Sequence, residues 1–108
     1  MYKLCFYVEE PYLEKVKAAV FAAGAGSYDG YSHCCWQTVG QGQFCPMAGS
    51  QPFLGEHGKL EVVAEFRVEV LVPKTLARTV VLALINAHPY EVPAYDLTQI
   101  ITLSDLPV

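Results

Sequence analysis

Charged residues and long apolar runs are both scarce in this sequence of 108 residues. Charged side chains make up 17% of it, and the longest candidate for a membrane helix runs only from Val80 to Ile85. A span needs ~18 apolar residues. The N-terminus reaches Glu9 and Glu10 without the basic region, apolar core and cleavage site of a signal peptide. We therefore expect a cytoplasmic protein without a membrane segment.

Positive charge is scarcer than negative charge. Lys and Arg number 7 against 11 Asp and Glu, which gives a net charge of -4. A protein that binds a phosphate backbone needs a basic face. The charge balance therefore excludes nucleic acid as an expected partner.

None of the four cysteines belongs to a C-x-x-C motif, which excludes a zinc knuckle and a thioredoxin-type site. Cys5 and the adjacent Cys34 and Cys35 lie within apolar, strand-like patterns, where cysteine is an ordinary small hydrophobic residue. Without an export signal, free thiols are favoured over disulfides.

Apolar residues, in contrast, are abundant. A hydrophobic fraction of 53% and a mean hydropathy of +0.27 are high for a chain that forms a single domain over residues 1–108. A domain of this size buries only about 65% of the surface that its unfolded chain exposes. The excess predicts further burial between subunits, and so a homo-oligomer.

Strand and helix patterns alternate along the whole chain. Alternating or β-branched apolar residues predict strands over residues 3–8, 31–39, 60–72 and 94–103. Helical spacing follows Pro11 and Thr75, where Thr75 fits an N-cap, and Gly24 and Pro89 end the two helices. The order β-α-β-β-α-β predicts an α+β ferredoxin-like sandwich, with both helices on one face of an antiparallel sheet.

The strand over residues 60–72 has two different faces. Its first face is apolar and carries Val62, Ala64, Phe66, Val68, Val70 and Val72. Its second face places Val63 and Leu71 among charged residues. Because the helices cannot cover both faces of the sheet, we expect a sheet from another subunit to cover the second.

A set of motifs spread over the chain resembles a known family. The set consists of Gly24-Ala25-Gly26, Tyr28-Asp29-Gly30-Tyr31, Cys34, Gly40-Gln41-Gly42-Gln43-Phe44, Pro46, Pro52, Gly55, Gly58-Lys59, Glu65 and His88-Pro89-Tyr90-Glu91. It resembles the YqfO-type domain, which occurs as an insert in the Nif-three dinuclear-metal proteins and as a free-standing short protein. The run from His88 to Pro93 is also similar to CutA, the divalent-cation-tolerance protein.

The resemblance implies a fold and an assembly but no catalytic centre. CutA and the PII signalling proteins share a ferredoxin-like trimer, so the resemblance implies a homotrimer of the PII/CutA type. The Nif-three proteins hold two metals with residues from flanking halves. We expect a free-standing domain without those halves, so their dinuclear site and any hydrolase activity are not carried over.

Residues 40–59 form the second notable segment, with five glycines and two prolines between two predicted strands. Long loops in compact domains are often binding loops, and PII-like proteins use the equivalent loop for partners and ligands. The alternative is an excursion that folds on itself through Phe44, Phe53 and Leu54. Because disordered segments are poor in aromatic residues, an ordered loop is favoured.

The three histidines differ in what their neighbours imply. His33 lies on a predicted strand, which indicates an interior or interface residue, and His57 lies in the loop, free to reach a metal or an anion. His88 is followed by Tyr90 and Glu91. One interpretation makes His88 a helix C-terminal cap, with Glu91 anchoring the imidazole or a backbone N–H. The other places both in an intersubunit cleft, with Glu65 nearby, where zinc or copper could bind.

Signals for catalysis are absent, because no serine has a G-x-S-x-G context and no Cys–His pair is evident. The leading hypothesis is a non-enzymatic, oligomeric binding or regulatory protein that senses a small ligand, metal or protein partner at an intersubunit cleft. The alternatives are a CutA-like metal-tolerance protein and a structural interaction module. The candidate ligand-binding residues are Gly40, Gly42, His57, Glu65, His88, Tyr90 and Glu91.

Overall fold

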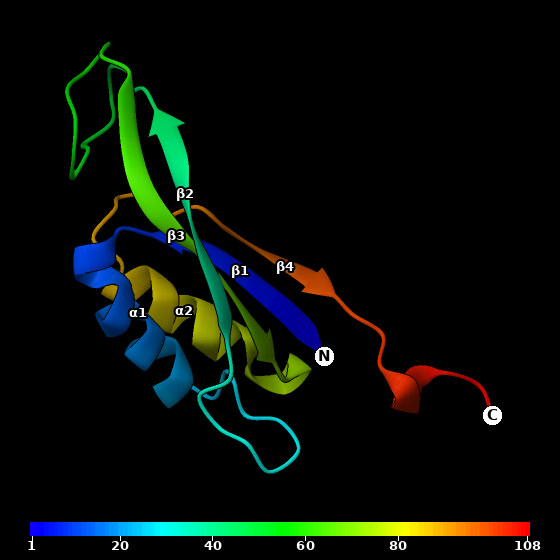
Figure 1. Ribbon diagram of the computed structural model, residues 1–108. Helices are drawn as coiled ribbons and strands as arrows, with labels where there is room; N and C mark the ends of the chain where they lie inside the picture. Colours follow the sequence, from blue (N-terminus) through cyan, green and yellow to red (C-terminus); the bar gives the residue numbers. More distant parts are fainter.

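The computed structural model describes residues 1–108 and contains one four-stranded sheet and two α-helices (Figure 1). The elements are β1 (Tyr2–Val8), α1 (Glu10–Ala22), β2 (Trp36–Phe44), β3 (Glu61–Val72), α2 (Ala77–Ala87) and β4 (Tyr95–Gln99). The strand order is β2-β3-β1-β4, and every neighbouring pair is antiparallel. The predicted α+β ferredoxin-like fold is confirmed.

Both helices lie on one face of the sheet (Figure 1). The core fills the space between them, because each element turns an apolar stripe inward. It contains Leu4, Phe6 and Val8 of β1, Leu13, Val16 and Val20 of α1, Val68, Val70 and Val72 of β3, and Val80 and Leu84 of α2. Burial of each such side chain stabilises the fold by about 1.5–3 kcal/mol.

The opposite face of the sheet carries no helix and mixes apolar with charged groups. Arg67 and Lys3 both lie close to the carboxylate of Glu69, at 3.7 and 3.9 Å. Trp36 at the start of β2 is 59% exposed, whereas Cys5 in the central strand is 4% exposed. The helix-free face therefore places an exposed aromatic side chain, Trp36, directly beside the charged Glu69.

The predicted bounds of the second strand, 31–39, are wrong. Residues between α1 and β2 form turns, with left-handed backbone angles at Gly26, Asp29, Gly30 and His33. The Gly26 N–H donates to Leu71 O at 2.8 Å, and the Cys34 N–H donates to Gly26 O at 2.8 Å. These bonds tie the segment to the end of β3 as a loop, so His33, Cys34 and Cys35 do not lie on a strand.

Strand β2 instead continues through Gly40 and Gly42 to Phe44, which pairs with Glu61. The interior glycines made these residues look like a loop, because glycine weakens a strand. Pairing with the long strand β3 overrides that preference. The long loop therefore covers residues 45–60 rather than 40–59.

Three smaller predictions also differ from the structure. Thr75 is not an N-cap: it lies in a 3₁₀ turn (Lys74–Leu76) in which the Leu76 N–H donates to Pro73 O, and α2 begins at Ala77. Strand β4 ends at Gln99 rather than at residue 103. The Ile100 N–H already donates to the O of Met1, the first residue of the chain, so residues 101–103 have no further residue of this segment to pair with. Val62 and Ala64 are exposed, because this part of β3 extends past the helices.

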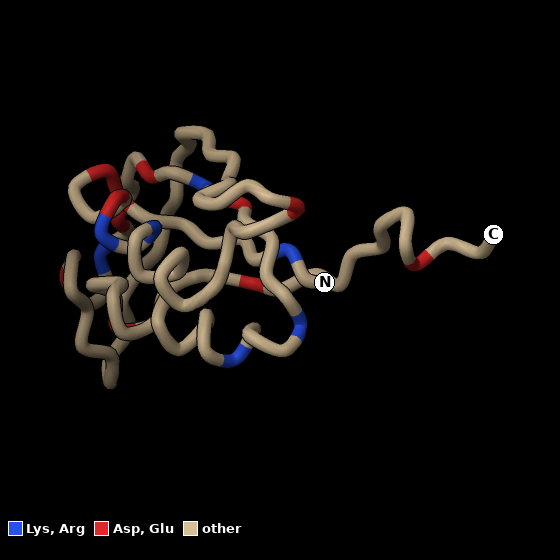
Figure 2. Tube along the Cα trace, turned by 90° about the horizontal axis from the view of Figure 1, so that it is seen from below, with Lys and Arg blue, Asp and Glu red and all other residues tan.

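The C-terminal residues extend away from the domain. Both views show them as a separate arm (Figures 1 and 2), and Leu103 on it is 84% exposed. Thr102 and Asp105 form a reciprocal capping box on a short 3₁₀ turn (Leu103–Asp105). Acidic and basic residues are interspersed over the domain (Figure 2). Neither helix has the length and apolar character needed to cross a membrane.

Candidate functional site

The loop over residues 45–60 folds back and packs on its own protomer. The Gly58 N–H donates to Pro46 O at 2.7 Å and closes the base of the loop. The Phe53 ring meets Tyr12 of α1 edge-on, with 5.6 Å between ring centroids, and lies 6.2 Å from the Tyr90 ring. The loop is therefore held by aromatic contacts to segments far away in the sequence, as the packed-loop interpretation expects.

A carboxylate provides a further anchor for this loop. Glu91 Oε1 accepts a hydrogen bond from the Gln51 N–H at 3.0 Å. The sequence suggested that Glu91 anchors either the imidazole of His88 or a backbone N–H. The structure supports the second option, across 40 residues of sequence.

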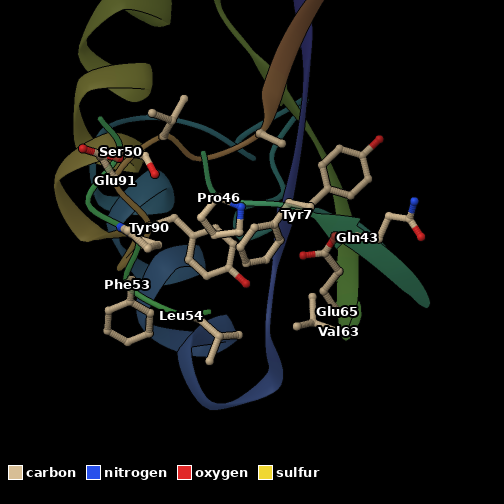
Figure 3. Close-up of a pocket in the computed structure, with 14 residues that line it drawn as sticks. Tyr7, Gln43, Pro46, Ser50, Phe53, Leu54, Val63, Glu65, Tyr90 and Glu91 are labelled. Carbon is tan, nitrogen blue, oxygen red and sulfur yellow. The ribbon is translucent and has the colours of Figure 1, made fainter. Parts of the chain in front are cut away.

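Between this loop and the sheet lies a cavity of about 300 Å³. Its walls come from the ends of β1, β2 and β3, from the loop, and from the segment between α2 and β4 (Figure 3). The lining residues are Tyr7, Gln43, Phe44, Pro46, Ser50, Pro52, Phe53, Leu54, Val63, Glu65, Tyr90, Glu91, Val92 and Ala94.

Glu65 on β3 is the carboxyl group at the sheet side of the cavity. A Cβ atom at Gly42 would clash with the Glu65 carboxyl, so the missing side chain at Gly42 makes the room in which that carboxyl lies. Glu65 forms no hydrogen bond or ion pair within the chain. Burial, together with the nearby charge of Glu9, raises the pKa of Glu65 above its ordinary value.

Tyr90 faces Glu65 from the opposite side of the cavity (Figure 3). Its hydroxyl donates to Glu9 Oε1 at 2.6 Å, and its ring packs on Phe44, with 5.8 Å between centroids. Burial and the hydrogen bond to Glu9 raise the pKa of Tyr90 well above its ordinary value. The phenol therefore remains a neutral donor at physiological pH, and its ring forms a fixed part of the wall.

His88 does not line the cavity, but it contacts the lining residue Tyr90. The side chain is buried, at 6% exposure, and follows the last turn of α2. Its Nε2 contacts Tyr7 O at 2.7 Å, and its Nδ1 accepts from the Tyr90 N–H at 3.2 Å. This pattern requires a neutral ring with the proton on Nε2. Burial lowers the pKa of His88, in agreement with that state.

His88 therefore joins three segments: the end of α2, the end of β1 and the wall residue Tyr90. This supports the structural interpretation of the histidine. Its bond goes to a strand carbonyl, however, and not to the last carbonyls of the helix. Both ring nitrogens are in use, so a metal would have to displace one of these hydrogen bonds.

The other predicted site residues lie away from the cavity or at its margin. His57 contacts Ser50 O through Nε2 at 2.8 Å, which stabilises the loop. Gly40 has open space beside it and does not line the cavity. No group of three or more His, Cys, Asp or Glu side chains in the chain is arranged to hold a metal ion. Of the seven predicted residues, Glu65, Tyr90 and Glu91 line the cavity, and Gly42 makes room for Glu65.

Sequence reasoning missed the contribution of Tyr7 and Val63 to the cavity. Both lie on the helix-free face, where the alternation in β1 and β3 places them. That alternation was visible, but nothing in it showed that residues 45–60 fold over this end of the sheet. All four cysteines are free, with Cys5 buried and Cys34, Cys35 and Cys45 exposed.

Comparison with known proteins shows that the chain is similar to one part of several longer proteins. It is 47% identical over 95 residues to a GTP cyclohydrolase 1 type 2 homolog of Bacillus subtilis, covering 88% of this chain and 26% of that protein. A protein of the same name from Mycobacterium tuberculosis gives 47% identity over 95 residues, with 88% and 25% covered. The crystal structure of a Bacillus cereus protein related to NIF3 superposes with a TM-score of 0.77 and 40% identity, over 89% of this chain and 24% of that one.

The resemblance to the YqfO-type domain of the Nif-three proteins is confirmed. The chain spans about a quarter of the length of the curated relatives that it matches. It also shares its fold with CutA1 from Pyrococcus horikoshii, at a TM-score of 0.69 and 15% identity, over 95% of this chain and 86% of that one. No family model matches the chain.

Proposed function

We propose that the chain is a non-enzymatic binding and regulatory domain that senses a small ligand in the cavity beneath the loop over residues 45–60. The observation that carries this proposal is the cavity itself. It combines mostly apolar walls with a partner-free carboxyl group, Glu65, which is the usual composition of a small-molecule site. The loop forms part of the cavity wall and also lies at the protein surface. A ligand that changes the packing of the loop would therefore also change the surface that a partner protein meets.

The proposal includes a homo-oligomer, with a trimer of the PII/CutA type as the expected form. The helix-free face supports this, because Trp36 is exposed there beside Leu71. The exposed apolar arm after β4 is a second surface suited to a neighbouring copy. Light scattering tests this directly, since the trimer has three times the protomer mass of 11.9 kDa.

The absence of an enzymatic role is also part of the proposal. The relatives are named as homologs of GTP cyclohydrolase 1 type 2, but the chain matches only about a quarter of them. The cavity holds carboxyls, phenols and the hydroxyl of Ser50, which donates to Met47 O rather than to a base, and this favours binding over acyl or phosphoryl chemistry. With four free thiols, the cytoplasm remains the expected location.

Divalent-cation binding is the weaker alternative. A structure from Archaeoglobus fulgidus with the same fold is described as a periplasmic divalent cation tolerance protein. In this chain His88 uses both ring nitrogens, and His57 already contacts a carbonyl. Titration with zinc and copper tests this alternative: affinity that falls in both His57→Ala and His88→Gln would favour it.

Filling the cavity tests the leading proposal. Ala94→Phe adds a ring at the cavity wall, whereas Ala64→Phe adds one at an exposed position of β3 outside it. We expect small organic probes to shift the amide resonances of the lining residues in the wild type and in Ala64→Phe, but not in Ala94→Phe. Shifts scattered over the surface, or unchanged by Ala94→Phe, would contradict a ligand site here.

A further inference from the structure

The charged side chains that line the cavity are all acidic. Its ionisable lining residues other than tyrosine are Glu65 and Glu91, and no Lys, Arg or His lines it. Glu91 is already engaged by the Gln51 N–H. Glu65 has no hydrogen bond or ion pair within the chain.

The basic residue that follows Glu65 on this face of β3 has another partner. Arg67 lies two residues along β3, on the same face of the sheet, and is paired in register with Tyr7. Its guanidinium lies 3.7 Å from Glu69, and neither Arg67 nor Glu69 lines the cavity. A carboxyl that is partly buried without a cation is the group that gains most from a cationic ligand.

Aromatic rings form much of the remaining wall. Tyr7, Phe44, Phe53 and Tyr90 all line the cavity, and Phe44 and Phe53 pack against Tyr90. Aromatic rings attract an ammonium group through their quadrupoles and attract its apolar substituents through dispersion. They offer no comparable attraction to an anion.

We propose that this cavity selects a small organic cation, an ammonium group on a compact apolar body, with Glu65 as its counter-ion and the four rings as its cage. The inference rests on the proposed function, because it specifies the class of ligand that the cavity senses. The volume of about 300 Å³ lies at the low end of the range for small-molecule sites, so the ligand is compact.

The same observations disfavour phosphate-bearing ligands. A phosphate site needs basic side chains or a cluster of free backbone N–H groups at a helix N-terminus. The cavity has no basic lining residue, and both helices begin outside its lining. Glu9 and Glu61 lie close enough to raise the pKa of Tyr90, and they add to the negative potential. Nucleotides and other polyanions are therefore poor candidates.

Gly42 has a definite part in this selectivity. Because it lacks a side chain, the Glu65 carboxyl can lie across it at the cavity wall. Gly42→Ala would push the carboxyl aside without removing its charge. Its backbone has no positive φ, so the substitution stores no backbone strain. Gly42→Ala therefore changes the position of the Glu65 carboxyl, whereas Glu65→Gln removes its charge.

Three probes of nearly equal shape test the inference. Choline carries a quaternary ammonium, 3,3-dimethyl-1-butanol replaces the charged nitrogen by carbon, and 3,3-dimethylbutanoate carries a negative charge. Each is titrated into the intact protein while amide chemical shifts are recorded. We expect choline to bind at least about tenfold more tightly than the neutral probe, and the anion to bind most weakly.

Substitutions assign this difference to Glu65. Glu65→Gln should reduce the preference for choline over the neutral probe to about twofold, and Gly42→Ala should reduce it in part. Glu14→Gln is the control, because Glu14 is an exposed carboxylate of α1 that lies outside the cavity and pairs with Lys17. It should leave the preference unchanged, and an unchanged amide spectrum far from the substitution shows that each variant is folded.

The outcomes separate the two levels of the proposal. Equal binding of the three probes, or tighter binding of the anion, overturns the cation inference but leaves the cavity as a ligand site. A choline preference that persists in Glu65→Gln also overturns it. If none of the probes shifts the lining residues, the proposed function and this inference both fail.

Discussion

Substitution of His88 probes the junction that supports the cavity wall. The imidazole links Tyr7 O and the Tyr90 N–H, and it is nearly inaccessible to water. His88→Ala leaves both backbone groups without a partner, and each such group costs about 1–3 kcal/mol when it is buried. Since Tyr90 is only partly buried, water recovers part of this cost. We expect a loss of about 2–4 kcal/mol in the free energy of unfolding.

Two further variants divide this loss between the two bonds. The amide nitrogen of Gln reaches the position of Nε2, so His88→Gln should keep the bond to Tyr7 O. The amide oxygen of Asn reaches the position of Nδ1, so His88→Asn should keep the bond from the Tyr90 N–H. Each should cost about half as much as His88→Ala in urea unfolding at fixed protein concentration.

The pH dependence of stability gives an independent readout. Burial lowers the pKa of His88 below 6.5, so near that pH the unfolded chain binds more protons than the folded one. The stabilisation is complete above pH 6.5 and is lost as the pH falls through the lowered folded pKa. His88→Gln should remove this part of the acid sensitivity. If wild type and His88→Gln lose stability in parallel between pH 7.5 and 5, the imidazole is not buried in its neutral form and the reasoning fails.

Three further predictions concern the turn, the loop and the core. Gly26→Ala should destabilise the protein by more than about 2 kcal/mol, since its φ is +79° and the new Cβ would lie 2.8–2.9 Å from the Phe21 ring and Cys34 O. Gly30→Ala meets no neighbour within 4 Å and should cost about 1 kcal/mol in the same denaturation assay. Glu91→Ala should speed hydrogen exchange at the Gln51 amide, whereas Glu56→Ala, which breaks an exposed ion pair with Lys59, should not. Leu84→Ala should lower the unfolding free energy by about 2–5 kcal/mol, and a loss below 1 kcal/mol would contradict its place in the core.

Much of the fold was predictable because the core-forming residues repeat with the period of their element. Leu4, Phe6 and Val8 alternate, and Val16 and Val20 recur at helical spacing. The error in the second strand arose where local preference and pairing disagree. The aromatic and β-branched residues between Tyr31 and Val39 predicted one strand, but residues 31–35 are held in turns. Gly40 and Gly42 are poor strand formers, yet they pair with β3.

The site was predictable only in part, because it depends on how a loop packs. Glu65, Tyr90 and Glu91 drew attention as ionisable or aromatic groups in unusual positions, and all three line the cavity. The position of His88 behind the wall depends on a contact with Tyr7, 81 residues away, and no local pattern encodes it. The sequence therefore indicated which chemical groups belong to the site. It did not indicate whether each group lines the cavity or lies behind its wall.

The outstretched C-terminal arm and the tall β2–β3 hairpin have a consequence for hydrodynamic measurements. The Cα radius of gyration is 15.4 Å, and the principal extents are 54 × 26 × 24 Å. A compact chain of this length would have a radius of about 13 Å, and a radius of 15.4 Å corresponds to a compact chain of about 170 residues. A lone protomer would thus leave a gel-filtration column early, at the volume of a globular protein half again as heavy. Subunit number should accordingly be read from scattered intensity or sedimentation equilibrium, which report mass independently of shape.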